Sequence, residues 1–274
     1  MIQFLEYNSL LKKFTNIIRK KRDNMGRTYV FSDIHGMLDL YKQIKAHLNT
    51  GNHKAIFLGD ACDRGEHGYM IMKDILRNDN IIYIKGNHED MFVHAARAIM
   101  NIIIEQNINV FELRNERDIQ DLIYNAYYND DVALHLNNGG FQTLYEWLKD
   151  GASMNIVNTI DRLPTYLEFV NNNGDKITFC HAGTLNKEKD NIDSRIWSRD
   201  HFFEKWDDGI LIHGHTPCQH LVKRLGQRRR SSSMVCPVWY CDNTKIDMDT
   251  GCFSTNIIYL MDVDSKEMIK FSAE

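Results

Sequence analysis

The stretch Gly59-Asp60-Ala61-Cys62-Asp63-Arg64-Gly65 follows the apolar run Ala55-Ile56-Phe57-Leu58, and the rest of the chain can be organised around these two segments. A short apolar run that ends at a glycine predicts a buried strand followed by a tight loop. Two carboxylates and a guanidinium therefore emerge at the carboxyl end of a strand, where α/β proteins place their chemistry. Asp60 can bind a cation, Arg64 can hold a phosphate and Asp63 can orient a neighbouring side chain. A solvated Asp/Arg turn would give the same pattern, so the rest of the chain must decide.

Length and composition favour a globular domain of enzyme size. The chain has 274 residues, of which 43% are hydrophobic and 3 are proline, and this is typical of a compact core. A net charge of -4, from 33 Lys and Arg against 37 Asp and Glu, gives no general attraction to nucleic acid or anionic membranes. The cysteines show no CxxC spacing, and there is no signal peptide or run of about 18 apolar residues. We therefore expect a cytoplasmic protein with reduced thiols and no membrane partner.

Residues 1–24 predict a helical extension, and residues 25–274 predict the main domain. Apolar side chains fall on one helical stripe, at Phe4, Tyr7, Leu11, Phe14 and Ile18. The basic run Arg19-Lys20-Lys21-Arg22 suits the C-terminus of a helix. We expect this helix to pack on the domain or on a second copy of the chain; a membrane-surface or targeting helix is the alternative.

Two more strands are expected to end in polar loops. Residues 28–32 predict a strand before Asp33-Ile34-His35-Gly36, and residues 81–84 predict one before Gly86-Asn87-His88-Glu89. Helical patterns at about 38–48 and 68–76 separate the three strands. This β-α-β-α-β order predicts parallel strands, so the three loops should share one edge of a sheet. In extended backbone the side chains of Asp33 and His35 would point the same way.

From about residue 91 to 161 the pattern changes to helices, at 93–104, 119–128 and 141–148, and we expect a helical insertion. Asn137-Asn138-Gly139-Gly140 predicts a turn within it. Its acidic residues are expected to form a solvated face, with substrate selection as the alternative. They are Glu112, Glu116, Asp118, Asp121, Asp130 and Asp131.

The strand pattern resumes at residue 165. Residues 165–170 and 176–180 flank an Asn/Gly-rich turn, which predicts a hairpin leading into His181-Ala182-Gly183. Residues 209–212 predict a strand before His213-Gly214-His215-Thr216-Pro217, and β-type runs follow at 235–240 and 254–263. The basic segment Arg228-Arg229-Arg230 is expected to lie on a surface loop; if the loop overhangs the site, it would attract phosphorylated ligands.

Donors that bind divalent metals thus follow five separate predicted strands. The set is Asp33, His35, Asp60, Asn87, His181 and His215. Carboxylate, imidazole and amide ligands without thiolate favour Mn, Fe or Zn over a cysteine-bound structural zinc. A lone histidine is more often packed or solvated, but five such motifs at strand ends predict a site for two divalent ions.

Five motifs resemble those of the calcineurin-like metallophosphoesterases. They are Asp33-Ile34-His35-Gly36, the segment 59–65, Gly86-Asn87-His88-Glu89, His181-Ala182-Gly183 and Gly214-His215-Thr216-Pro217. Their order and spacing are most similar to the bacterial and phage branch of the PPP serine/threonine phosphatases, which includes the phage lambda phosphatase. The fragments Asn138-Gly139-Gly140, Trp197-Ser198-Arg199 and Asp249-Thr250-Gly251 also look like that branch. The resemblance implies an α/β fold, a four-layer β-sandwich flanked by helices, in which residues 25–274 form the catalytic domain.

The resemblance also implies roles for the site residues. One metal ion would be held by Asp33, His35 and Asp60. The other would be held by Asp60, Asn87, His181 and His215, with Asp60 bridging the two. The ions, for which Mn is the expected metal, would activate a bridging hydroxide for direct attack on phosphorus. Arg64, Asn87 and Arg199 would bind phosphate, and His88, oriented by Asp63, would protonate the leaving group.

The expected reaction is hydrolysis of phosphomonoesters, with phosphoserine and phosphothreonine in proteins as substrates. Glu89 favours this interpretation, because related dinucleoside tetraphosphate hydrolases typically have Asp there. A dinucleoside polyphosphate, a capped RNA end or another small nucleotide phosphoester is the alternative substrate, and only the RNA end would make a nucleic acid a partner. A non-catalytic metal-binding scaffold is a remote alternative that Arg64 and Arg199 argue against.

His213 departs from the family pattern, since that branch usually has an apolar or aromatic residue there. We expect a spectator or a side chain that hydrogen-bonds near a ligand, with direct metal binding as the alternative.

Overall fold

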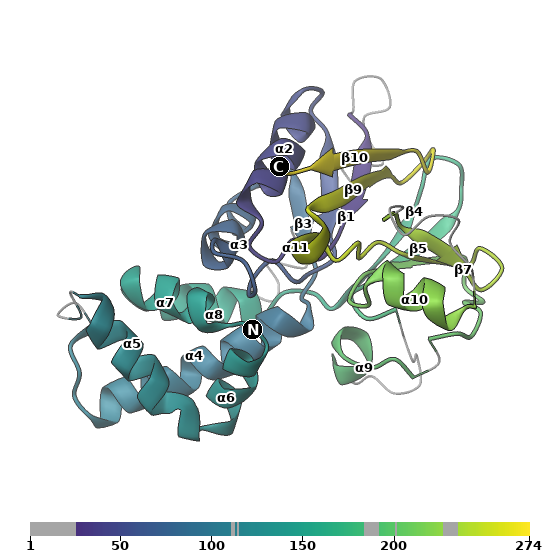
Figure 1. Cartoon of the computed structure of the whole chain (residues 1–274). Coiled ribbons are helices and arrows are strands. Elements are labelled where there is room, and N and C mark those ends of the chain that lie inside the picture. Colours follow the sequence, from purple (N-terminus) through teal and green to yellow (C-terminus); the bar gives the residue numbers. More distant parts are fainter. Residues whose placement is uncertain (1–25, 111–112, 114, 184–191, 201, 227–234) are drawn as a thin grey trace.

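The computed structural model describes residues 26–110, 113, 115–183, 192–200, 202–226 and 235–274. The predicted N-terminal helix, Glu112 and the Arg228–Arg230 segment lie outside these ranges. Two five-stranded sheets face each other, and a group of helices extends from one side of them (Figure 1). This arrangement confirms the predicted α/β sandwich flanked by helices.

The first sheet contains the predicted β-α-β-α-β unit. Its strands run in the order β10-β9-β1-β2-β3. They are β1 (Thr28–Phe31), β2 (Lys54–Phe57), β3 (Ile81–Tyr83), β9 (Ile257–Asp262) and β10 (Met268–Ser272). β1, β2 and β3 are parallel, joined by α2 (Leu38–Asn49) and α3 (Gly68–Leu76), whereas β9 is antiparallel to β1 and β10. The carboxyl ends of β1 and β2 therefore bring their polar loops to the same edge, as predicted.

The second sheet brings the histidine segments to the same region. Its order is β4-β5-β6-β8-β7. The strands are β4 (Tyr166–Val170), β5 (Lys176–Cys180), β6 (Ile210–His213), β7 (Val238–Tyr240) and β8 (Lys245–Asp247). The predicted β4–β5 hairpin is confirmed, with Tyr166 opposite Cys180, and β5, β6 and β8 are parallel. The sequence patterns gave no signal for β8, which has only three residues and carries a charge at each end.

The two sheets pack through apolar side chains that alternate along their strands. The first sheet contributes Val30, Ile56, Leu58, Ile84, Met261 and Val263, and the second contributes Ile177, Phe179, Ile212 and Ile246. A second core lies between the outer face of the first sheet and helices α2 and α3. A smaller one packs α10 (Cys218–Arg224) against β7 on the other side. These layers place the loops after β1, β2, β5 and β6 between rigid elements.

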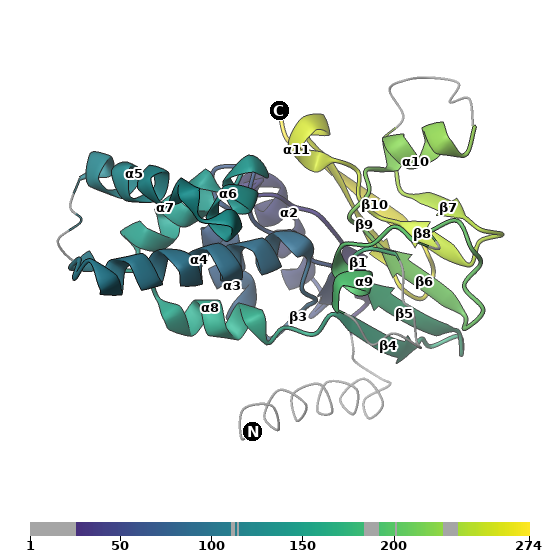
Figure 2. The ribbon, with the colours of Figure 1, turned by 90° about the horizontal axis from the view of Figure 1, so that it is seen from below.

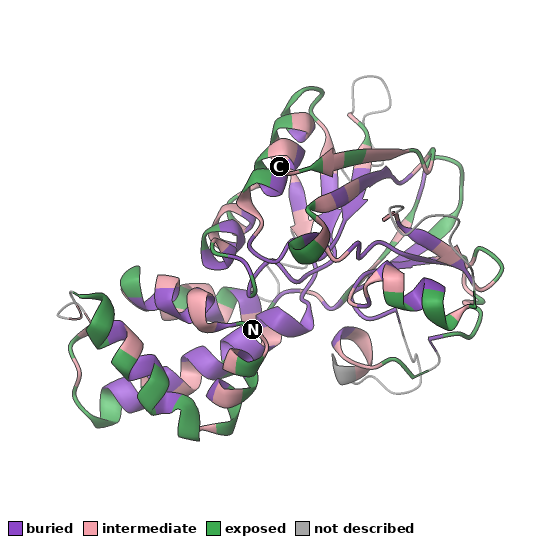
Figure 3. Cartoon of the chain, viewed as in Figure 1, coloured by how far each residue is buried: buried purple, intermediate pink, exposed green. Residues whose placement is uncertain are grey.

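The helical segment lies beside α2 and α3, away from the second sheet, as Figure 2 shows. It consists of α4 (Asn87–Glu105), α5 (Glu116–Asn125), η2 (Ala126–Tyr128), α6 (Asp130–Asn137), α7 (Phe141–Lys149) and α8 (Met154–Asp161). Its inward faces are buried and its outward faces exposed (Figure 3). The acidic residues expected at its surface are exposed where they are described, at Glu116, Asp118, Asp121, Asp130 and Asp131.

One expectation about this segment was wrong. The helix expected at 93–104 begins at Asn87, because Gly86 caps it and the Glu89 side chain accepts a hydrogen bond from the Gly86 N–H. Asn87, His88 and Glu89 therefore lie in the first turn of a helix and not in a loop. Two short helices, α6 and α8, had no clear apolar repeat in the sequence, and they are stabilised by contacts with α4.

Candidate metal centre

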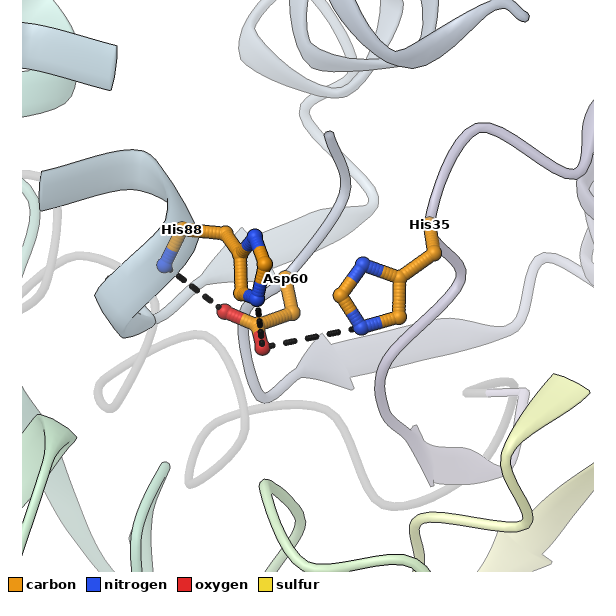
Figure 4. A group of neighbouring side chains, drawn as sticks. All are labelled: His35, Asp60 and His88. Atoms are coloured by element: carbon orange, nitrogen blue, oxygen red, sulfur yellow. Dashed lines mark hydrogen bonds and ion pairs between the residues drawn. The ribbon is translucent and has the colours of Figure 1, made fainter. Parts of the chain in front are cut away.

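Two groups of possible metal ligands meet where these segments converge. One contains His35, Asp60 and His88, and the other contains Asp60, His181 and His215. Within each group the donor atoms all lie within 4.8 Å of one another. Figure 4 shows His35 and His88 from two different elements pointing toward the Asp60 carboxylate. Asp60 is thus common to both groups, which is the position predicted for a bridging ligand.

The loops reach this arrangement through left-handed backbone. Asp33 and His35 have φ values of 53° and 42°, and Asp60, Asp63 and Arg64 have φ values of 62°, 68° and 67°. The extended backbone expected at Asp33 and His35 is therefore wrong. Left-handed conformations of residues other than glycine are uncommon and concentrate at functional sites, because the surrounding structure must stabilise them.

Hydrogen bonds to backbone carbonyls fix the tautomers of three histidines. His35 Nδ1 donates to the Cys62 carbonyl at 2.9 Å, and His181 Nδ1 donates to the Leu58 carbonyl at 2.7 Å. His215 uses its other nitrogen, since Nε2 donates to the Trp197 carbonyl at 3.1 Å. A carbonyl can only accept, so in the neutral ring the remaining nitrogen of each histidine carries a lone pair. Such bonds are typical of metal-binding histidines.

Those lone pairs face acceptor oxygens. His181 Nε2 lies 3.3 Å from Asp60 Oδ2 and 3.0 Å from Asn87 Oδ1. His215 Nδ1 lies 2.9 Å from Asn87 Oδ1, and His35 Nε2 lies 3.7 Å from Asp60 Oδ2. Convergent lone pairs of this kind are stabilised by a cation among them, so the residues fit a divalent metal with N and O ligands.

The electrostatics of the buried ring nitrogens agree with this fit. Burial lowers the pKa of His35 to about 3 and that of His215 to about 2, so both rings are neutral, the form that binds metals. Burial would also lower the pKa of His181, but the Asp60 carboxylate raises it to about 10. Without a metal, His181 Nε2 therefore carries a proton beside the Asp60 carboxylate, at the place where a bound cation would take the lone pair.

Asp33 lies next to these groups but outside them. Its carboxylate accepts hydrogen bonds from the Ser32 hydroxyl and, at 3.1 Å, from the backbone N–H of His215. It thereby ties the loop after β1 to the loop after β6. The predicted ligand role of Asp33 stays a prediction.

His88 and Asp63 form the pair expected for a proton donor and its orienting carboxylate. His88 Nδ1 donates to Asp63 Oδ2 at 2.7 Å, and its Nε2 lies 3.9 Å from Asp60 Oδ2. Burial would lower the pKa of His88, but the Asp60 and Asp63 carboxylates raise it. The two carboxylates thus favour proton uptake by the ring, and in its protonated form His88 could deliver that proton to a leaving group.

The two arginines predicted to bind phosphate have different partners. Arg64 Nη1 donates to His35 Nε2 at 2.6 Å, and its Nη2 donates at 3.0 Å to His88 Nε2, which can accept only while the His88 ring is neutral. Arg199 Nε donates to the Thr216 hydroxyl at 2.9 Å. Arg64 uses the lone pair of His35 that a metal would use, so the guanidinium and an ion compete for that nitrogen.

Glu89 is a site residue whose role the sequence did not reveal. Its side chain is 0% exposed, and its oxygens accept four hydrogen bonds from N–H and O–H groups, those of Asp60, Ala61, Gly86 and Tyr83, and a longer one from the Cys62 thiol at 3.9 Å. It cannot touch a substrate directly, but it joins the segment 59–65 to the start of α4. A Cβ on Gly86 would lie 2.2 Å from Asp60 Oδ1, so only glycine allows this close approach. The available signal was the three-residue spacing from Gly86 to Glu89, which is typical of a helix N-terminus.

His135 and Thr143, from the helical segment, were also missed as neighbours of the site. His135 Nε2 and the Thr143 hydroxyl both donate to Asp63 Oδ1 at 2.8 Å. No local sequence pattern could have indicated these contacts, because 72 and 80 residues separate the partners.

His213 lies outside both donor groups found among the described residues. Its Nε2 hydrogen-bonds the Tyr240 hydroxyl at 2.7 Å, its Nδ1 lies 3.0 Å from the Gly214 carbonyl and its ring packs edge-on to Phe202. The cysteines nearest the site, Cys62 and Cys180, are buried, and burial raises the pKa of both thiols.

Comparison with protein families identifies the chain. The model of the calcineurin-like phosphoesterases matches residues 26–248, which include every residue of both donor groups. The chain belongs to this family. Members of the family are metal-dependent hydrolases with a dinuclear metal centre, and the two donor groups sharing Asp60 fit such a centre.

Solved structures similar to this chain are distant in sequence, and only the first of the three below has a TM-score above 0.5. A candidate diadenosine tetraphosphatase has 11% identity and a TM-score of 0.53, with 92% of this chain and 96% of that chain covered. A metallophosphoesterase from Sphaerobacter thermophilus has 13% identity and a TM-score of 0.49, covering 92% and 89%. A cold-active protein-tyrosine phosphatase of a psychrophilic Shewanella species has 15% identity and a TM-score of 0.49, covering 90% and 78%. These likenesses concern the fold alone. None of the curated proteins compared with the chain matches it significantly.

The described helices were compared with the requirements of a membrane-spanning segment. Among the residues described, no helix has both the length and the apolar character needed to cross a bilayer.

Proposed function

We propose that this phosphoesterase hydrolyses phosphomonoesters, and that its substrates are phosphoserine and phosphothreonine in proteins. The observation that carries the proposal is the His88–Asp63 pair beside Asp60, the carboxylate shared by both donor groups. A serine alkoxide is a poor leaving group, so its departure needs a proton from a positioned acid. The order of the sequence motifs, which is that of the bacterial and phage PPP phosphatases, supports a protein substrate.

In this proposal the metal-binding side chains form two sets that share Asp60. Asp33, His35 and Asp60 hold one divalent ion, and Asp60, Asn87, His181 and His215 hold the other. When bound, the ions supply Lewis acidity and an activated water for attack on phosphorus. Mn²⁺ is the proposed metal, because imidazole and carboxylate ligands suit it.

The substrate is held and the leaving group protonated by the remaining residues. Arg64 and Arg199 bind the phosphate oxygens, with an added contact from the Asn87 amide. His88 donates a proton to the departing oxygen, and Asp63 keeps its ring in the required orientation. The structure has Arg64 on His35 and His88, so Arg64 must turn away from His35 when metal binds.

A dinucleoside polyphosphate is the second candidate substrate. The fold is shared with a candidate diadenosine tetraphosphatase, and a fold does not determine a substrate. Glu89, which favoured a protein substrate by resemblance, is buried and acts on selectivity only through the loops it joins. A cytoplasmic location is part of the proposal and rests on the composition alone.

The test of the reaction is turnover of para-nitrophenyl phosphate with Mn²⁺, after removal of bound metal by a chelator. We expect activity only after Mn²⁺ is restored. The absence of turnover with Mn²⁺, Fe²⁺ and Zn²⁺ alike would refute the enzyme proposal and leave the metal-binding scaffold.

The test of the substrate is a parallel assay on a phosphoserine protein, a phosphothreonine protein and diadenosine tetraphosphate. We expect kcat/KM to be higher for the phosphoproteins. A preference for diadenosine tetraphosphate would establish the second candidate.

A further inference from the structure

The Asp63 carboxylate is held from two sides. His88 occupies Oδ2, while His135 on α6 and Thr143 on α7 both donate to Oδ1. All four side chains are buried, with exposures between 0% and 2%. Burial would raise the pKa of Asp63, but His135 and His88 hold it below its usual range, so the group is a carboxylate that accepts three side-chain hydrogen bonds.

The same part of the helical segment holds the backbone of the loop. The Asp63 N–H donates to the Thr143 hydroxyl at 3.1 Å, and the Arg64 N–H donates to the Gly139 carbonyl at 3.0 Å. Asp63 and Arg64 are both left-handed, a conformation that costs roughly 1–2 kcal/mol per residue other than glycine. The turn between α6 and α7 therefore stabilises the loop in the one conformation that aims Asp63 at His88.

Burial of the His135 ring would destabilise the fold if the ring did not hydrogen-bond Asp63. Its side chain is 0% exposed, and Nδ1 has no hydrogen-bond partner among the described residues. An unpaired buried polar atom destabilises the fold, so the bond from Nε2 to Asp63 is what offsets its burial. Gly140 makes room for the ring, because a Cβ there would lie 2.4 Å from His135 Nε2 and Cδ2.

We propose that His135 is a positioning residue for the proton donor: through Asp63 it fixes the His88 ring, so that the helical segment completes the active site. This inference rests on the proposed phosphomonoester hydrolysis. Without the donors to Oδ1, the Asp63 carboxylate can rotate about its Cβ–Cγ bond, and His88 Nδ1 loses its fixed acceptor. The proton then reaches the leaving group less often, while metal and phosphate binding stay intact.

The test compares leaving groups. His135→Leu removes the N–H donor at similar volume, and His135→Gln can place an N–H where Nε2 lies. A positioned acid contributes about 10²–10⁴-fold, so we expect His135→Leu to lower kcat for phenyl phosphate by about 10- to 100-fold. For 2,4-dinitrophenyl phosphate, whose leaving group needs no proton, we expect a loss below about threefold. His135→Gln should recover most of the loss on phenyl phosphate.

Two further variants separate positioning from stability. Thr143→Val removes the other donor to Oδ1 and should show the same dependence on the leaving group. Ile99→Val, in the buried core on α4, should lower both rates by similar small factors. Equal losses of His135→Leu on both phosphates, or no loss on either, would overturn the proposal.

A readout independent of turnover is the ring N–H of His88. In the full chain with Mg²⁺, nitrogen-15 NMR should show a protected Nδ1–H for His88, and His135→Leu should broaden or remove this signal. If the wild type hydrolyses no phosphoester, the proposed function fails, and the His88 Nδ1–H signal alone then tests whether His135 positions the His88 ring. Its persistence in His135→Leu would overturn the positioning role.

Discussion

Replacing Glu89 by Gln should destabilise the metal-free protein severely. Oε2 accepts the N–H groups of Asp60 and Gly86, both at 2.8 Å, and Oε1 accepts the Ala61 N–H and the Tyr83 hydroxyl, both at 2.7 Å. A glutamine has one acceptor oxygen. With its amide N–H₂ in place of Oε1 it faces the Ala61 N–H, while the Tyr83 hydroxyl can turn to accept from it; in place of Oε2 it would face two N–H donors. Hydrogen bonds to a charged group contribute about 1.5–3 kcal/mol each and neutral ones about 0.5–1.5 kcal/mol, so losing one and weakening the other three predicts about 3–6 kcal/mol.

This loss is large against the total stability of a domain, which is typically about 5–15 kcal/mol. The assay is urea unfolding followed by circular dichroism, in the presence of a chelator so that bound metal does not contribute. Tyr83→Phe is the matched control, because it removes one of the four donors and should lower the free energy of unfolding by about 1–2 kcal/mol. If Glu89→Gln unfolds within about 1 kcal/mol of the wild type, Glu89 does not hold the two segments together as argued.

Four other predictions concern the site and the helices that support it. Asp60→Asn should lose Mn²⁺ binding and turnover together, measured by calorimetry and by hydrolysis of para-nitrophenyl phosphate; full retention of both would contradict the shared-ligand role. Arg64→Ala should bind Mn²⁺ at least as tightly as the wild type, because its guanidinium competes for His35 Nε2, while KM rises; a weaker Mn²⁺ affinity would count against that competition. His213→Phe should still bind two Mn²⁺ ions by calorimetry, and a drop to one ion would make His213 a ligand. Gly140→Ala, at an ordinary φ of -79°, should cost about 1–3 kcal/mol in urea unfolding through collision with His135, and an unchanged midpoint would mean that the ring moves freely.

Much of the fold follows from local patterns. The apolar runs before Asp33 and Asp60 are strands β1 and β2, and α2 and α3 lie where the helical pattern predicted them. The parallel pairing also follows, because strands joined by helices must run the same way. The short strand β8 and the helices α6 and α8 gave weak signals, since contacts with neighbouring elements and not propensity stabilise segments of this length.

For the candidate site too, the sequence predicted some features and not others. Residue types and their order along the chain indicated His35, Asp60, His181 and His215, which lie in the two donor groups, because metal chemistry restricts ligands to a few side chains. His88, predicted as the proton donor, also lies in one of these groups, and Asp33 lies outside both. The details of orientation did not follow: Asp33 and His35 were expected in extended backbone and are left-handed. Left-handed backbone depends on what the surrounding loops can stabilise, which no single segment reveals.

By itself, the sequence determined that carboxylate, imidazole and amide side chains follow successive strands, a pattern that predicts a metal site. Only the tertiary structure decided how these side chains are held. Glu89 accepts four hydrogen bonds under the loop 59–65, and His135 reaches Asp63 from a helix 72 residues away. Such contacts depend on how whole elements pack in three dimensions, and short-range sequence patterns cannot predict that packing.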